Sequence, residues 1–126
     1  MSAHRGNLSL EERTRRIRAA ITAGHMNQDL GEALISSAII HSQLHEAEKY
    51  LETGEITMAI DYYEKSVQKL KNLNLYLEKA ALTPDQREAI RVNLADTLSA
   101  AHTSFSQHSL YFAVTSSIHK GGDFSA

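Results

Sequence analysis

The 126-residue chain has no cysteine, no tryptophan and a single proline. Without cysteine it forms no disulfide and carries no thiolate chemistry, as fits an intracellular protein. Its longest apolar-rich run, ALISSAII at 33–40, is far too short to span a bilayer, and the N-terminus has no apolar signal-peptide core. We therefore expect one cytoplasmic domain whose association with membranes is only indirect.

The charge is small overall and unevenly distributed. Net charge is −2, but residues 1–26 carry five arginines against two glutamates, whereas residues 27–126 carry eight basic and thirteen acidic side chains. No basic face is large enough to make nucleic acid the leading partner. The basic N-terminal segment and the acidic remainder are expected to attract each other.

The periodicity of apolar residues predicts an all-α protein, because no segment sustains the alternation of a strand. We expect helices at residues 10–23, 30–52 and 56–81, and a fourth that begins after Thr83. Gly24 and Gly54 are expected to end the first two, since glycine accepts the left-handed conformation of a helix C-cap. Expected N-terminal capping boxes pair Ser9 with Glu12, Asp29 with Glu32, and Thr83 with Gln86, with Pro84 opening the last helix.

Three of these helices carry apolar stripes at steps of three and four, typical of helices packed nearly parallel to their neighbours. Short connections between long helices force neighbours to be antiparallel. We predict an antiparallel three-helix bundle over residues 27–112, preceded by a short amphipathic helix within residues 1–26 and followed by a flexible tail at 113–126. The predicted core positions are Ala33, Ser37, Ile40, Leu44, Ala47 and Leu51; Ile56, Ile60, Tyr63, Val67, Leu70, Asn74 and Leu77; and Ile90, Leu94, Leu98, Ala101 and Phe105.

Two histidine arrangements are candidates for catalytic or metal-binding sites. His41 and His45 lie four residues apart on one helix face, with Glu48 one turn further on, and such imidazoles can share a metal ion. We interpret them as part of a polar stripe, because no third ligand and no H-E-x-x-H motif is evident. His119 beside Lys120 resembles the histidine of phosphotransfer bundles, which place it mid-helix and further from the lysine. We predict no metal, no cofactor and no enzyme; the alternative is a four-helix bundle enzyme or histidine phosphotransfer protein.

The chain over about residues 32–108 resembles the MIT domain, the microtubule-interacting and trafficking three-helix bundle. The second helix of that family reads A-x-x-x-Y-x-x-(A/G)-(I/L)-x-x-L after a glycine-containing turn, and here the matching residues are Ala59, Tyr63, Ser66, Val67 and Leu70. Residues 90–102, IRVNLADTLSAAH, resemble its third helix at Ile90, Arg91, Leu98 and Ala101. In that segment Asn93, Thr97, Ala100 and His102 replace the lysine, tyrosine, arginine and glutamate of the family pattern.

The resemblance implies a non-enzymatic docking module in protein transport. MIT domains bind short helical motifs of ESCRT-III-like or autophagy partners in grooves between their helices, at endosomal or autophagic membranes. Carried onto this chain, the groove between the third and fourth helices is the expected partner-binding site. Its expected lining is Arg91, Ala95, Leu98 and His102 from the fourth helix, and Lys69, Asn72 and Tyr76 from the third.

Residues 10–18, LEERTRRIR, resemble the ligand motif L-x-x-R-L-x-x-L-(K/R) that such grooves bind, with Thr14 in place of a leucine. The ligand-like residues are Leu10, Arg13, Ile17 and Ile21. GHM at 24–26 also resembles a cloning junction, so the segment is either native or a fused ligand. We predict that its apolar face docks in a groove of its own bundle or of a second copy, giving a homodimer; otherwise it is a free basic arm.

Overall fold

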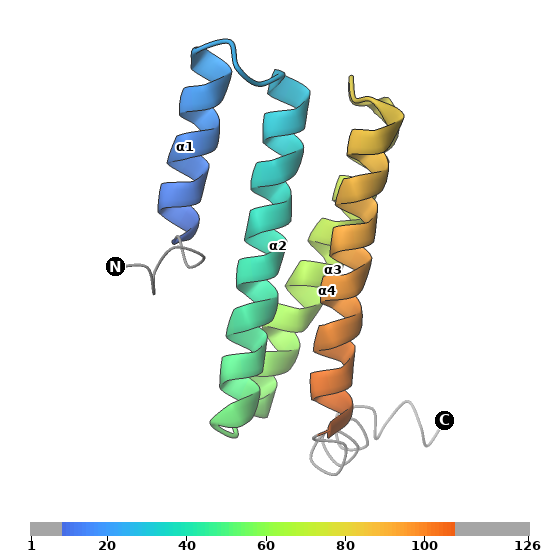
Figure 1. The fold of residues 1–126 in the computed structure, drawn as a ribbon. Helices are drawn as coiled ribbons and strands as arrows, with labels where there is room; N and C mark the ends of the chain where they lie inside the picture. Colours follow the sequence, from blue (N-terminus) through green and yellow to red (C-terminus); the bar gives the residue numbers. More distant parts are fainter. Residues whose placement is uncertain (1–8, 108–126) are drawn as a thin grey trace.

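The computed structural model describes residues 9–107, which form four α-helices and no strand. They are α1 (Leu10–Thr22), α2 (Gln28–Glu52), α3 (Ile56–Lys79) and α4 (Pro84–Gln107). Helices α2, α3 and α4 form a bundle in which α2 contacts both of the others, and α1 packs on α2 alone (Figure 1). Consecutive helices run in opposite directions. The expected all-α fold is therefore confirmed, with α1 as a separate helix on the outside of the bundle.

Most helix ends follow from local chemistry that the sequence displays. The Ser9 side chain accepts a hydrogen bond from the Glu12 backbone N–H at 3.0 Å, so α1 begins as expected. Gly24 and Gly54 have φ angles of +80° and +82°, the left-handed conformation expected where α1 and α2 end. Thr83 and Gln86 form a complete capping box, with side chain-to-backbone distances of 3.0 and 3.1 Å.

The start of α2 corrects one prediction. Asn27, not Asp29, is the N-cap, and its side chain accepts a hydrogen bond from the Leu30 N–H at 2.9 Å. Asp29 lies in the first turn and accepts instead from the Tyr76 hydroxyl at 3.2 Å and from the Ala81 N–H at 2.7 Å. The expected box of Asp29 with Glu32 is therefore wrong, because Asp29 ties the start of α2 to α3 and the connection that follows it.

The core confirms most of the predicted apolar stripes. All six predicted positions of α2 are buried, as are Ile90, Leu94, Ala101 and Phe105 of α4, while Leu98 is half-buried. On α3 the buried residues are Ala59, Ser66, Leu73 and Leu77. Asn74, predicted to be in the core, is exposed. The α3 stripe therefore runs through Leu73 instead, one residue away from the predicted position.

Two expectations concern residues outside the described range. The predicted tail at 113–126, with His119 and Lys120, lies there, and so does the end of the predicted 27–112 domain. Within residues 9–107, no helix combines the length and the apolar character needed to cross a membrane.

Candidate docking groove between α1 and α4

A groove of about 770 Å³ lies between α1 and α4, with α2 as its floor. The starting end of α1 forms one wall, the middle of α4 forms the other, and residues 38–48 of α2 lie between them. Four of its lining residues have small side chains, so a ligand backbone placed in the groove would meet little steric hindrance there. These are Ala38 and Ser42 of α2 and Ala100 and Ala101 of α4.

Hydrogen bonds between polar side chains hold α4 against the α2 floor. His41 Nε2 lies 2.8 Å from the Asn93 side-chain oxygen and 3.3 Å from the Thr97 hydroxyl oxygen. An amide oxygen only accepts, so His41 donates from Nε2 in this contact. About two helical turns further along both helices, the Ser104 hydroxyl donates to Glu48 at 2.9 Å. These contacts keep the floor and the α4 wall in a fixed relation.

Two of the three candidate metal ligands, His41 and Glu48, take part in these contacts between α2 and α4. His41 and Glu48 each make a hydrogen bond to α4, whereas His45 is exposed along the groove. Among residues 9–107 no group of three histidine or acidic side chains is arranged to hold a metal ion. The structure therefore gives His41 and Glu48 a packing role between two helices.

The α1 wall rests on α2 through an unusually close contact at Gly31. A Cβ atom added to Gly31 would overlap Ile21 Cδ1 and would lie 2.8 Å from Ile21 Cγ1 and 3.2 Å from Ile17 Cγ2, so any larger residue would require these side chains to shift. Arg18 pairs with Glu32 of α2 at 3.1 Å beside this contact. The predicted ligand-like residues Ile17 and Ile21 thus pack within the same chain, while Leu10 and Arg13 line the groove.

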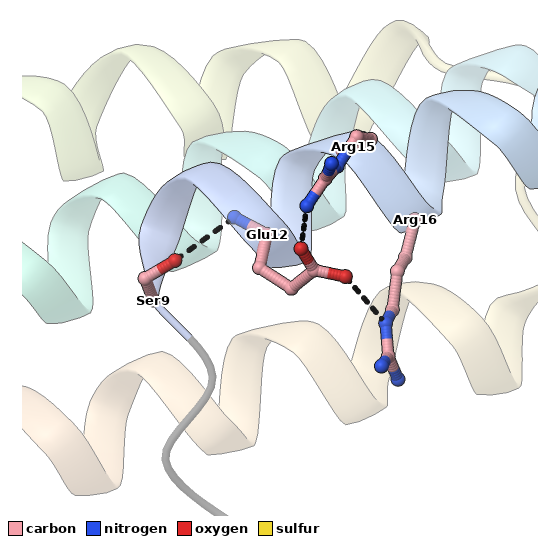
Figure 2. Close-up of polar contacts among 4 residues, drawn as sticks. All are labelled: Ser9, Glu12, Arg15 and Arg16. Carbon is pink, nitrogen blue, oxygen red and sulfur yellow. Dashed lines mark hydrogen bonds and ion pairs between the residues drawn. The ribbon is translucent and has the colours of Figure 1, made fainter.

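The remaining polar contacts of α1 lie within the helix itself (Figure 2). Glu12 accepts from Arg16 Nε at 3.1 Å and also pairs with Arg15, and both arginine side chains are largely exposed. The expected reciprocal bond from the Glu12 side chain back to Ser9 is replaced by these ion pairs. Exposed pairs at this spacing stabilise a helix by only about 0.2–0.5 kcal/mol each, but they help α1 to be helical without neighbours.

The two walls of the groove differ in charge. Arg13 stands on the α1 side, whereas Asp96 stands on the α4 side and Glu48 on the floor. Asp96 continues into an acidic strip along α4 that includes Asp85 and Glu88. A ligand in the groove therefore meets a positive group on one flank and negative groups on the other.

The predicted partner-binding residues of α4 share one face, which points away from this groove. Arg91, Ala95, Leu98 and His102 recur at steps of four and three, and Arg91 pairs with Glu78 of α3 at 3.8 Å. Leu98 is half-buried, whereas Ala95 and His102 are exposed. This face lies towards α3, as the sequence analysis expected.

The predicted residues of α3 lie on a different side from the one expected. The Tyr76 hydroxyl donates to Asp29 of α2, and Lys69 and Asn72 are in line with Tyr76 at steps of three and four. The side of α3 that meets α4 instead carries Tyr63, whose ring centroid lies 4.8 Å from that of Phe105, and Glu78. The two predicted sets therefore do not face each other across one groove. Their role in binding stays a prediction.

The comparisons with known proteins add no identity. No family model matches this chain, and no curated protein or solved structure matches it at a significant level. The features that bear on its function are therefore the groove, α1 and the MIT-like spacing of residues in α3 and α4.

Sequence reasoning missed the groove between α1 and α4 and, separately, the close contact that Gly31 makes with α1. Gly31 falls within the expected helix at 30–52 and lies inside α2, but the apolar pattern assigned it no contact. A usable signal was present: a glycine weakens a helix interior, so its occurrence there suggests a close approach by another backbone or side chain. The isoleucines on the preceding helix were the obvious candidates for that approach.

Proposed function

We propose that this protein is a non-enzymatic docking module that binds a short helical motif of a partner protein in the groove between α1 and α4. The observation that carries the proposal is the groove itself, a space of about 770 Å³ that is bounded by three helices and lined in part by small side chains. Helix-in-groove recognition uses such a surface, with apolar anchors giving affinity and charges giving register.

The MIT-like spacing supports a more specific form of this proposal. Helices α2, α3 and α4 agree in number and order with a three-helix MIT bundle, and Ala59 sits at a fully buried position, as the small residue of that pattern should. On this basis we propose ESCRT-III-like or autophagy proteins as partners. The proposed place of action is the cytoplasm, at the periphery of endosomal or autophagic membranes.

The charges of the groove describe the partner that fits it best. Asp96 and Glu48 favour a helix with a basic flank towards α4, and Arg13 favours an acidic or neutral flank towards α1. On the side of the partner helix that faces the groove between these flanks, small apolar side chains would contact Ala38 and Ala100. Such charges mainly set the orientation and the rate of association, since exposed pairs contribute little affinity.

Two exposed alanines of α4 provide a matched test of the site. Ala100 lines the groove, whereas Ala95 lies on the face towards α3 that the MIT resemblance favours. Ala100→Arg and Ala95→Arg add the same side chain to the same helix, and arginine is a good helix former, so both variants should fold.

The assay is fluorescence anisotropy with labelled C-terminal helical peptides of ESCRT-III subunits. We expect the full chain to bind at least one peptide, Ala100→Arg to weaken that binding by tenfold or more (about 1.4 kcal/mol), and Ala95→Arg to leave it nearly unchanged. The reverse pattern would move the site to the α3-facing side. Absence of binding to every peptide would refute the proposed partner class.

A further inference from the structure

The outward side of α2 carries a second apolar surface, separate from the core of the bundle. Gly31, Ile35 and Ala38 are buried and recur at steps of four and three, so they lie on one face. Ile35 is nine residues before Leu44, which is two and a half helical turns, so the two side chains point in opposite directions. The core lies on the Leu44 side. The outward face, here called the Gly31 face, is covered by α1.

The fit between α1 and the Gly31 face is specific in shape. Ile17 and Ile21, one turn apart on α1, both reach Gly31, and a Cβ there would lie 2.8 Å from Ile21 Cγ1. Arg18, next to Ile17, pairs with Glu32, next to Gly31. The contact is therefore specific for two branched aliphatic side chains four residues apart, with an arginine directly after the first of them.

The attachment of α1 nevertheless involves a single neighbouring helix. None of its residues is buried, and among the described helices it contacts only α2. Its own N-cap at Ser9 and its ion pairs from Glu12 to Arg15 and Arg16 do not depend on the bundle (Figure 2). Because the Gly31 face is opposite the core, α1 can leave it without disturbing the packing of α2 against α3 and α4.

We propose that the Gly31 face is an interaction surface for a basic amphipathic helix supplied by another protein chain, and that α1 is its built-in occupant. The external helix carries two branched aliphatic residues four apart and an arginine directly after the first, as α1 does. The connection at residues 23–27 keeps α1 at high local concentration, so α1 suppresses binding of the external helix until it is displaced. This property holds whether or not the groove beside α1 binds a partner.

The probe for this surface is a fluorescent peptide of residues 9–24, which includes the Ser9 cap. In the full chain, Ile17→Asp with Ile21→Asp should release α1, since carboxylates cannot occupy the space over Gly31. We expect the peptide to bind this double variant at least about tenfold more tightly than the wild-type chain, which its own α1 blocks. Adding Gly31→Leu to the double variant should abolish binding, because the side chain fills the space the isoleucines need.

Far-UV circular dichroism establishes that each variant keeps its bundle. Equal binding of the peptide to wild type and double variant, or binding that survives Gly31→Leu, would overturn the proposal. The proposal would also be overturned if the peptide bound vesicles of phosphatidylcholine and phosphatidylserine but did not bind the released bundle. In that case α1 would be a segment that binds membranes, not the occupant of a protein surface.

Discussion

A substitution at Ala59 tests how tightly α3 packs against α2 and α4 at the end of the bundle where α3 begins. Its side chain is fully buried, in a cluster with Ala47 and Leu51 of α2 and Phe105 of α4. The Tyr63 ring, one turn along α3, packs against Phe105 and fixes that aromatic side chain from one side. A larger residue at Ala59 therefore has to push apart three helices.

The sign of the effect of Ala59→Leu depends on whether there is room for three more carbon atoms. If there were, their burial would stabilise the fold by about 2 kcal/mol, at roughly 0.8 kcal/mol per methylene. In a closed contact, overpacking costs about 1–3 kcal/mol instead. The complete burial of Ala59 between residues of two other helices favours the second outcome. For a chain of this size that lowers Tm by roughly 3–15 °C.

Thermal unfolding followed by circular dichroism at the helical band measures this directly. Ala95→Leu is the matched control, because Ala95 is an exposed alanine in the middle of a helix. Both changes have nearly the same intrinsic helix propensity, so the control should shift stability by less than about 0.5 kcal/mol. An Ala59→Leu variant whose Tm equals or exceeds that of wild type would refute the close contact between α3 and α2.

Two further predictions concern the turn after α2 and the contact at its start. Gly54→Val should cost about 1–3 kcal/mol, since φ is +82° and a side chain there is strained even though it meets no atoms, while Gly54→Asn should cost less; equal losses in the two variants would contradict this. Burial, the negative charge of Asp29 and the hydrogen bond to it raise the pKa of Tyr76. Tyr76 in the unfolded chain therefore ionises first, and its contribution to stability is present below the ordinary tyrosine pKa of about 10 and is lost as the pH rises beyond it. Tyr76→Phe should thus flatten the alkaline fall of the unfolding free energy, and identical slopes for the two proteins would contradict the shift.

The helix ends could be predicted because their causes lie within a few residues of sequence. Ser9, Gly24, Gly54 and the Thr83–Gln86 box each act through a neighbouring backbone group, so the pattern alone indicates the outcome. The stripe of α2 was predictable for a similar reason, since every core position repeats at helical spacing.

The site was less predictable because it depends on contacts between distant parts of the chain. Asp29 looked like a cap, but Tyr76 and Ala81 reach it from about fifty residues away. The buried stripe of α3 includes Leu73 and not the predicted Asn74, so Asn74 is exposed and Tyr76 faces α2. The groove needs α1, α2 and α4 together, and which side of α2 receives α1 depends on Gly31, whose role appears only once Ile17 and Ile21 are placed over it.

The most direct test of the account is an NMR titration of the isotope-labelled full chain with the ESCRT-III peptide that binds it best. If the partner helix lies in the groove, the largest amide shift changes should fall on the groove residues Ala38, Ser42, Thr97 and Ala100. Shift changes centred instead on Ala95, Leu98 and His102, or no saturable change at any residue, would contradict the docking groove between α1 and α4.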